Sequence, residues 1–434
     1  MPVTEKFILH DPIGAVQRLR RHARRFIRFR QGKGRNGSSG RSMAGFGGLT
    51  WSATAPILLA HHEIPPETPM LKRFSIVFLI AFTTLVLAQE GKVHQPTLTP
   101  QNSGTTQLLI AVSPVNSQVV WAAGTGGTFV VTTNGGTTWT SGVVPGASAL
   151  QFRDVQGVSD KIAYLLSIGN NTGDFRIYKT VDGGSTWTIE FKNHTKKAFY
   201  DCFAFWTPDR GIVQSDSVKG VFPDIRTTDG TTWKSISKNM PPALPGEASF
   251  SSSGTCVATE GMLNAWIATG GSKISRILAT RDGGDTWNAY NTPLKSSATA
   301  GVFSVAFRDP EHGIVGGGDL AKKDPNKART AVSQDGGKTW KFTNKPPVTG
   351  AIFCLAYVSG LGHSDADERG GNRAVVVTAD TAPNFDSGAA AWSPDEGKTW
   401  YKLPKVSGYW GVAFASPKAG WFVGTGGTIL KISF

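Results

Sequence analysis

Cysteine is scarce in this sequence, which has only Cys202, Cys256 and Cys354 among its 434 residues. An odd number of widely spaced cysteines excludes a disulfide-rich scaffold and the paired spacing of a zinc site. Each cysteine lies in a stretch of apolar or small residues. A bridge between Cys202 and Cys256 could form in an oxidising compartment, but these surroundings favour buried free thiols. We predict no metal site.

Charged residues are also few, at 18%, whereas glycine (52) and tryptophan (13) are abundant. This composition is typical of short strands joined by tight turns, not of long solvated helices. The net charge of +14 is uneven, because residues 1–69 hold eleven Lys or Arg against four Asp or Glu. From Gln89 onward there are 32 basic and 27 acidic residues. This near balance argues against nucleic acid as a partner.

A long hydrophobic run is missing too. The apolar stretch at 74–88 has 15 residues, which is short for a membrane span. Basic residues precede it and small residues end it, the pattern of a signal peptide at 70–88. We therefore expect translation to start at Met70, and cleavage near Ala88-Gln89 to release a secreted or periplasmic protein without a transmembrane segment. Residues 1–69 are interpreted as a non-native or disordered basic extension, with a genuine basic arm as the alternative.

One short pattern, here called the octet, recurs six times. The copies are TTNGGTTW (132–139), TVDGGSTW (180–187), TTDGTTW (227–233), TRDGGDTW (280–287), SQDGGKTW (333–340) and SPDEGKTW (393–400). Their tryptophans are Trp139, Trp187, Trp233, Trp287, Trp340 and Trp400, which are 48, 46, 54, 53 and 60 residues apart. A repeat of this length with strand-like content predicts the blades of a β-propeller, each a four-stranded antiparallel sheet.

The residues around each octet supply the four strands of a blade. Three strands precede it, as in VFSVAF (302–307), GIVGG (313–317) and TAVS (330–333). The octet then turns the chain into a fourth strand, because the glycines of its DGG core tolerate positive φ.

The ends of the chain are predicted to share one blade. Residues 410–434 supply three strands and no octet, whereas 94–104 resemble the strand that follows an octet elsewhere. We predict that 94–104 pairs with 428–433 and closes the ring, which removes an exposed sheet edge. Six complete units and this composite predict an all-β, seven-bladed propeller. It would occupy 89–434 as a single, monomeric domain.

The octets resemble the Asp-box, also called the BNR repeat, S/T-x-D-x-G-x-T-W. This repeat occurs in sialidases, sortilin-type receptors, xyloglucan-cleaving enzymes and photosystem II assembly-factor propellers. With GTGGT (124–128 and 424–428) and GEASFSSSGTC (246–256), the chain most resembles bacterial secreted proteins related to the photosystem II stability/assembly factor, often labelled "oxidoreductase". The resemblance covers essentially all of 89–434 and implies the propeller fold. It implies little about activity, because these proteins include enzymes, receptors and scaffolds.

The repeated acidic residues are expected to be structural. They are Asp182, Asp229, Asp282, Asp335 and Asp395. The octet is the turn between the third and fourth strands, at the face away from the channel mouth, where a carboxylate can accept hydrogen bonds from its own turn. The first copy has Asn134 instead, and the third lacks one residue before Thr231. Asn134 supports a structural role, because a turn acceptor needs no charge whereas a general acid must ionise. The octet tryptophans are expected to fill the space between blades.

Functional residues are expected at the channel mouth on the opposite face. The candidate carboxylates are Asp154, Asp201, Asp216, Asp319 and Asp380, and the candidate ligand-binding residues are Arg153, Tyr200, Phe303, Phe353, Tyr409 and Trp410. Aromatic rings beside carboxylates suit carbohydrate or peptide binding, and a carboxylate pair could serve glycoside hydrolysis. The alternative is that these residues are solvated loop ends and aromatic side chains packed into the channel.

Three other functions are disfavoured. Sialidases need three arginines, a Tyr–Glu pair and an Asp acid, usually with one arginine in an early F/Y-R-I-P segment. The nearest early match here is FRDV (152–155), and Arg153, Arg276 and Arg308 do not form an evident triad. GTGGT joins two strands with no helix after it, so it offers no pyrophosphate site, and no cofactor is predicted. The acidic stretch HSDADE (363–368) lacks the spacing of a calcium loop and favours a solvated loop.

The sequence therefore predicts a binding or assembly module for a protein segment or a cell-envelope glycan. The alternative is a glycoside hydrolase, without sialidase activity, that uses carboxylates on the same face. A close carboxylate pair in an open cleft would favour hydrolysis, and a mouth filled by aromatic side chains would favour binding.

Overall fold

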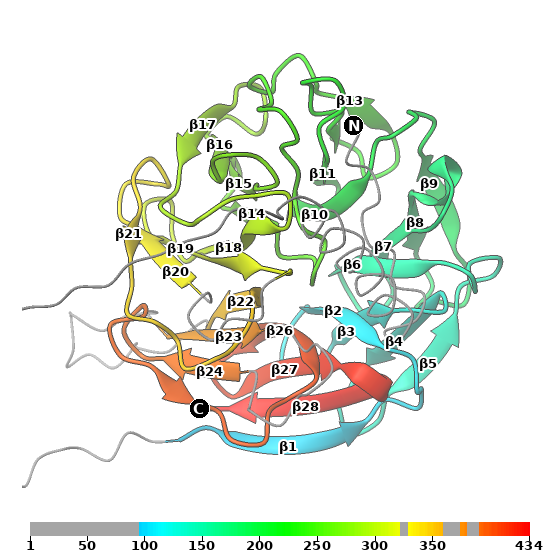
Figure 1. Ribbon diagram of the computed structural model, residues 1–434. Helices are drawn as coiled ribbons and strands as arrows, with labels where there is room; N and C mark the ends of the chain where they lie inside the picture. Colours follow the sequence, from blue (N-terminus) through cyan, green and yellow to red (C-terminus); the bar gives the residue numbers. More distant parts are fainter. Residues whose placement is uncertain (1–94, 322–328, 359–373, 380–389) are drawn as a thin grey trace, which may run out of the picture. The chain divides into compact units, whose positions relative to one another are not determined.

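The computed structural model describes residues 95–321, 329–358, 374–379 and 390–434. From Pro96 onward these form one compact unit. Within it, 28 strands make seven antiparallel four-stranded sheets around a central axis (Figure 1). The unit is an all-β, seven-bladed propeller, as the octet spacing predicts.

In blades 1 to 4 the strands follow one another outward from the axis. Blade 1 contains β2 (Leu109–Pro114), β3 (Val120–Gly124), β4 (Thr128–Thr132) and β5 (Thr140–Val143). Blade 2 contains β6 (Gln151–Gly157), β7 (Ala163–Ile168), β8 (Arg176–Thr180) and β9 (Thr188–Lys192). Blade 3 contains β10 (Tyr200–Thr207), β11 (Arg210–Ser215), β12 (Ile225–Thr227) and β13 (Trp233–Ser235). Blade 4 contains β14 (Val257–Glu260), β15 (Asn264–Ala268), β16 (Arg276–Thr280) and β17 (Asn288–Asn291).

The remaining blades complete the ring. Blade 5 contains β18 (Ala300–Phe307), β19 (Gly313–Asp319), β20 (Arg329–Ser333) and β21 (Lys341–Phe342). Blade 6 contains β22 (Ile352–Tyr357), β23 (Val375–Ala379), β24 (Ala390–Ser393) and β25 (Tyr401–Lys402). Blade 7 contains β26 (Tyr409–Ser416), β27 (Ala419–Gly424), β28 (Thr428–Ser433) and β1 (Thr97–Asn102). Two short 3-10 turns, η1 (Thr172–Asp174) and η2 (Thr425–Gly427), lie between strands.

Blade 7 is built from both ends of the described chain. β1 pairs antiparallel with β28, from Thr97 opposite Ser433 to Asn102 opposite Thr428. The first and last strands lie side by side at the outer edge of this sheet in Figure 1. An edge that would otherwise be open is thereby paired inside one blade.

The core lies between neighbouring blades. Strands β3 and β7 have every residue buried, because both of their faces are covered by adjacent sheets. Trp121 of blade 1 and Trp266 of blade 4 are fully buried, and each indole N–H donates to a loop carbonyl of the next blade, at 2.7 and 2.8 Å. Truncating such a side chain to alanine typically costs about 3–5 kcal/mol.

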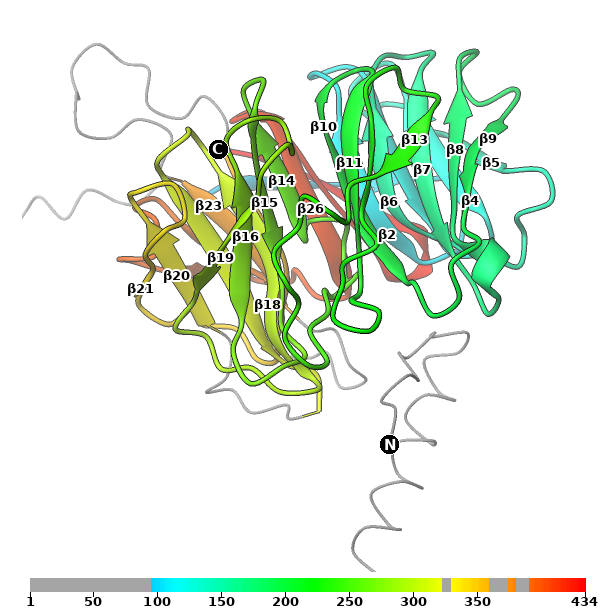
Figure 2. The same ribbon diagram turned by 90° about the horizontal axis from the view of Figure 1, so that it is seen from above.

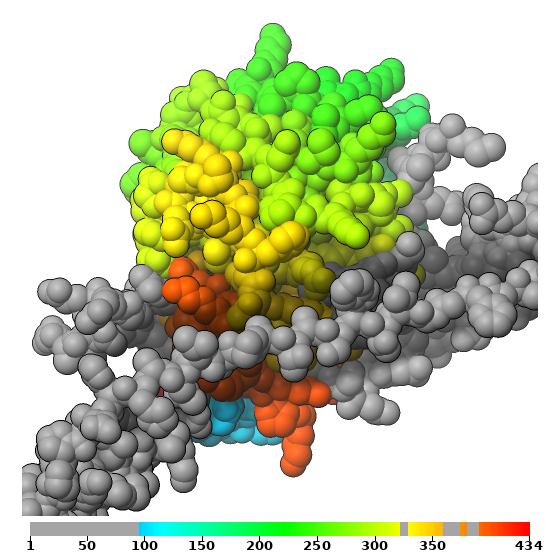
Figure 3. Space-filling model, turned by 60° about the vertical axis from the view of Figure 1, so that its left-hand side comes forward, coloured from blue at the N-terminus to red at the C-terminus, as the bar shows by residue number. Residues whose placement is uncertain are grey.

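The loops gather at two faces. We call octet face the side with the octets and the loops between first and second strands. We call mouth face the side with the loops between second and third strands and between successive blades. The strands run between these faces in the view of Figure 2. In Figure 3 blade 5 (yellow) lies directly against blade 4 (yellow-green). In the described part of the chain no helix has the length and apolarity to cross a membrane.

Candidate functional site

The octet carboxylates are occupied by their own turns. In the second octet, Asp182 Oδ1 accepts from Thr186 N–H at 2.9 Å and Oδ2 from the Thr186 hydroxyl at 2.6 Å. The Thr180 hydroxyl donates to Asp182 and accepts from Gly184 N–H. These bonds, first of all that from the Thr186 hydroxyl, lower the pKa of Asp182 to about 2. The carboxylate is thus ionised, and both of its oxygens accept hydrogen bonds within its own turn.

The same pattern recurs at the corresponding positions of the other octets. The backbone N–H groups of Thr286, Thr339 and Thr399 donate to Asp282, Asp335 and Asp395 at 2.9, 2.9 and 2.7 Å. In the shortened third octet Asp229 accepts from two backbone N–H groups, which lower its pKa. Asn134 accepts the equivalent bond from Thr138 N–H at 3.0 Å. A neutral amide therefore replaces the carboxylate in the same geometry.

The octet tryptophans lie against neighbouring strands and blades. Trp187 meets Trp121 of blade 1 edge-on, with ring centroids 6.3 Å apart, and Trp233 meets Phe205 edge-on at 5.9 Å. Trp139 donates to Gln101, Trp340 to Gly337 and Trp400 to Asn344, and Trp287 is buried beside blade 3 residues. These contacts place the indoles between or beside blades.

The channel mouth is filled by packed aromatic side chains, which is the alternative to the expected ring of ligand-binding residues. Phe303, Phe353 and Trp410 are buried in one apolar cluster with Ile110 and Ala351. They lie in the first halves of the innermost strands of blades 5, 6 and 7, so the rings converge on the axis. Leu108, Phe250 and Leu320 pack against this cluster and remain partly exposed. We call these three residues the apolar floor.

A segment that the sequence analysis did not assign crosses the channel. Residues 250–255, here called the plug, belong to the long connection between blades 3 and 4. Ser251 O accepts from Arg153 of blade 2 at 3.2 Å, and Phe353 O of blade 6 accepts from the Ser252 hydroxyl at 2.7 Å. Thr255 shares a 2.7 Å hydrogen bond with Ser304 of blade 5. The available signal was the run of small residues in an overlong interblade connection.

Arg153 and Asp154 are held beneath the plug in β6. Asp154 accepts from Val155 N–H at 2.8 Å and Phe203 N–H at 2.9 Å, and its burial raises its pKa well above the usual value. Burial lowers the pKa of Arg153 to about 10, although the charge of Asp201 opposes this shift. Gly254, with φ of +80°, approaches Asp154 so closely that a Cβ would not fit. These residues hold the plug and do not line an open cleft.

Blade 3 holds a buried acidic cluster. Tyr200 and Asp201 are both buried, and the Tyr200 hydroxyl donates to Pro223 O at 3.1 Å. Burial raises the pKa of Tyr200, and the charge of Asp224 adds to the shift. Asp224, which sequence reasoning missed, accepts from Ser215 N–H at 2.9 Å, but its Oδ2 has no partner in the described residues. Burial raises the pKa of Asp224 well above its usual value.

The other candidates are dispersed. Asp216 accepts from Ser249 N–H at 3.1 Å, and Asp319 accepts from the Thr299 hydroxyl at 2.8 Å. Tyr409 is partly exposed and packs against Phe422, with ring centroids 5.6 Å apart. Asp380 and the acidic stretch 363–368 lie outside the described residues. The described candidate carboxylates are thus buried or engaged at separate loop ends.

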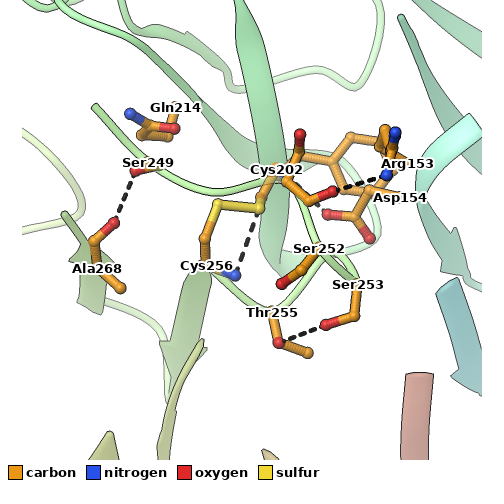
Figure 4. The surroundings of a disulfide bond; sticks show 12 residues. Arg153, Asp154, Cys202, Gln214, Ser249, Ser252, Ser253, Thr255, Cys256 and Ala268 are labelled. Atoms are coloured by element: carbon orange, nitrogen blue, oxygen red, sulfur yellow. Dashed lines mark hydrogen bonds between the residues drawn. A yellow bond between two sulfur atoms is a disulfide. The ribbon is translucent and has the colours of Figure 1, made fainter. Parts of the chain in front are cut away.

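Cys202 and Cys256 form a disulfide, so the preference for free thiols at these positions was wrong (Figure 4). The long connection after blade 3 returns to the axis and brings the two Cα atoms to 5.9 Å, although 54 residues separate them in sequence. Cys256 follows the plug directly, so the bond ties the end of the plug to β10. Cys354 is a buried free thiol, as expected.

The two faces differ in charge. Described mouth-face loops carry eight exposed lysines, the mouth-face lysines: Lys196, Lys197, Lys219, Lys238, Lys273, Lys295, Lys345 and Lys405. The carboxylates in the same described loops are Asp174, Asp216, Asp224 and Glu247. All four accept hydrogen bonds, and Asp224 and Glu247 are buried. Described octet-face loops carry eleven acidic residues, Asp160, Asp182, Asp209, Asp229, Asp282, Asp285, Asp309, Glu311, Asp335, Asp395 and Glu396, against six basic ones, Lys161, Arg281, Arg308, Lys338, Lys398 and Lys418. The exposed positive charge therefore lies on the mouth face.

No metal centre emerges from these groups. Within the described ranges, no three His, Cys, Asp or Glu side chains are placed to hold a metal ion together.

Comparison with known proteins finds a partial similarity to one photosystem II stability/assembly factor. No family model matches it. The chloroplastic photosystem II stability/assembly factor HCF136 of Cyanidioschyzon merolae is 25% identical over 238 residues, which are 51% of each protein. The chain thus spans about half the length of this curated relative.

Solved structures share the fold. One, described as "YCF48 bound to D1 peptide", is 16% identical with a TM-score of 0.53, and covers 79% of this chain and 98% of its own. YCF48 from Cyanidioschyzon merolae is 15% identical with a TM-score of 0.54, and covers 77% of this chain and 98% of its own. At these identities the likeness establishes the propeller fold alone.

Proposed function

We propose that this propeller is a binding and assembly module that holds a protein segment across its mouth face. The observation that carries the proposal is the filled channel mouth, with its apolar floor surrounded by the mouth-face lysines. A segment with apolar and acidic side chains could pack on the floor and pair with the lysines around it.

The similarity to an assembly factor supports the same role. The matched relative is named for photosystem II stability and assembly, and one structural neighbour binds a D1 peptide. We carry over the class of partner, a protein segment, and propose that a segment like the D1 peptide binds this chain. A cell-envelope glycan is the weaker proposal, because the aromatic rings expected to stack on sugars are largely buried.

Glycoside hydrolysis is not proposed. It requires two carboxyl groups facing each other across an accessible bond. Asp154 and Asp201 are buried, Asp216 accepts from Ser249 N–H of the connection between blades 3 and 4, and Asp319 accepts from Ala321 N–H of the loop that follows it.

We further propose that the octets are Asp-box turns and that the protein is exported. The recurrent carboxylate and amide bonds within the octets support the first proposal. The Cys202–Cys256 disulfide supports the second, since such bonds persist in oxidising compartments. The expected signal peptide lies outside the described residues.

The test is a binding titration with a defined peptide. Fluorescently labelled D1 peptide is titrated with the full chain, and anisotropy is read at low and at physiological salt. We expect saturable binding that weakens with salt and falls at least tenfold in K295E/K405E. The matched control, K338E/K398E, changes the same charges on the octet face and should bind as the wild type does. Equal losses in both variants, or no binding by the wild type, would contradict the proposal.

A further inference from the structure

The mouth face carries a tight hairpin in the loop between β11 and β12 of blade 3. Val218 and Val221 exchange two backbone hydrogen bonds, at 2.8 and 3.2 Å, around a two-residue turn of Lys219 and Gly220. Both turn residues have positive φ, which defines the tight turn favoured in β-hairpins. The turn presents the exposed Lys219 beside Val221, which is 47% exposed. We call it the first tip.

A second tip lies in the adjacent blade. The loop between β15 and β16 presents the exposed Lys273 beside Ile274, which is 42% exposed. Each tip therefore pairs one cation with one branched apolar side chain that is largely in water.

The segment between the tips braces both of them. Ala243 N–H donates to Gly220 O at 3.0 Å, which ties the first tip to this segment. Glu247 of this segment accepts from the Thr269 hydroxyl at 2.7 Å and from Arg276 Nε at 2.8 Å. Thr269 and Arg276 flank the loop of the second tip, so the segment is tied to both ends of that loop. The tips are therefore held in place before any partner arrives, which lowers the ordering cost of binding.

Backbone strain points to the same face. Four described residues other than glycine have positive φ, and three of them are the mouth-face residues Lys197, Lys219 and Lys405. A residue with a side chain is strained in the left-handed backbone conformation, whereas glycine is not. Such strain is found most often at functional sites. Three of the four strained turns thus place a lysine on the mouth face, and one of these lysines, Lys219, lies in the first tip.

The described loops of the octet face do not combine exposed apolar side chains with an excess of basic residues. The octet face also exposes apolar side chains, with Val181 at 62% and Met262 at 57%. Its loops, however, carry more acidic than basic residues, and Val181 directly precedes the ionised Asp182. An anionic surface would be repelled there and attracted on the mouth face.

We propose that the two tips dock the propeller onto an anionic lipid surface. Val221 and Ile274 enter the headgroup region shallowly, while Lys219 and Lys273 pair with lipid phosphates. Apolar side chains flanked by lysines are the pattern of interfacial membrane attachment. A protein segment is the less favoured occupant of the tips, because these side chains lie at loop ends and not in a groove. This inference goes beyond the proposed function and does not depend on it.

The test places a polarity-sensitive fluorophore at each tip in the full chain. V221C and I274C are labelled with bimane, and V181C and M262C serve as matched labels on the octet face. Vesicles of phosphatidylcholine with 30% phosphatidylglycerol should shift the emission of the tip labels to shorter wavelength and protect them from iodide. The octet-face labels should not respond, whatever other parts of the chain bind lipid.

Lysine variants then test the charge requirement. Adding K219Q and K273Q to V221C should weaken the vesicle titration by about fivefold per lysine, or about 25-fold together. K338Q and K398Q in the same background should leave the titration unchanged.

Each alternative result overturns the proposal. These results are no response at the tips, an equal response on the octet face, an equal response to pure phosphatidylcholine, or no effect of the tip lysines. A response to poly-L-glutamate without a response to vesicles would assign the tips to an acidic protein segment.

Discussion

The two faces of the propeller use their charged residues in different ways. On the octet face, carboxylates such as Asp182 are ionised and bound by the N–H and hydroxyl groups of their own turns. On the mouth face, the lysines are exposed and carboxyls such as Glu247 are turned inward. Repeated charge is therefore structural on the octet face, and we propose that the unrepeated charge on the mouth face serves a partner.

The largest expected effect concerns the anchor of the plug. C202S/C256S should lose about 4 kcal/mol of unfolding free energy, since the bridge closes a loop of 54 residues. Urea unfolding of the full chain measures this, with C354A as a control that keeps the bridge. If the unfolding free energy of the double variant lies within about 1 kcal/mol of the wild-type value, the disulfide that holds the plug does not stabilise the propeller.

The second prediction contrasts a buried carboxyl with the octet carboxylates. The pKa of Asp224 is raised in the folded protein, so the native state keeps a proton that the unfolded chain releases above about pH 4. Wild-type stability should therefore fall as pH rises from about 4 toward the folded pKa, by up to about 1.4 kcal/mol per pH unit. D224N removes this contribution because an amide does not titrate. Its amide oxygen can still accept from Ser215 N–H, so the hydrogen bond is kept.

Unfolding free energies at pH 5, 6 and 7 check this sign. The advantage of D224N over the wild type should grow with pH, whereas D282N on the octet face should show no such growth. A constant difference between D224N and the wild type would mean that Asp224 is ionised throughout.

The smallest effect is expected within an octet. D282A loses the bonds to Thr286 and should cost about 1 kcal/mol at neutral pH, whereas D282N should cost less than half of that. Burial acts to raise the pKa of Asp282, but the Thr286 and Thr280 hydrogen bonds outweigh it and lower the pKa to about 2. A lowered folded pKa gives stability that is present above about pH 4 and lost as pH falls toward 2.

The gap between wild type and D282A should therefore close in acid. Thermal unfolding at pH 7, 4 and 2.5 measures it. If D282N is as destabilised as D282A, the charge matters at the octet and the inference from Asn134 fails.

The fold was predictable because the same short sequence pattern recurs along the chain. Gly and Trp, with Asp or Asn, recur at the same place in blades 1 to 6, and all seven blades are four-stranded antiparallel sheets. The missing octet after β28 likewise pointed to a strand shared with the start of the ring.

The site was less predictable because its contacts occur once. Nothing in the spacing of Phe250, Ser252 and Phe353 reveals that the plug meets blade 6 across the axis. The approach of Cys256 to Cys202 depends on the path of the same connection, so the apolar and small residues around each cysteine gave the wrong preference for free thiols. Buried Asp224 carries no motif at all.

The central claim is that the mouth face, and not the octet face, binds the partner. Lysine acetylation of the full chain, read by mass spectrometry with and without D1 peptide, tests it directly. The account predicts that the peptide protects mouth-face lysines such as Lys295 and Lys405 and leaves Lys338, Lys398 and Lys418 as reactive as before. Protection of the octet-face lysines, or protection of neither set, would contradict it.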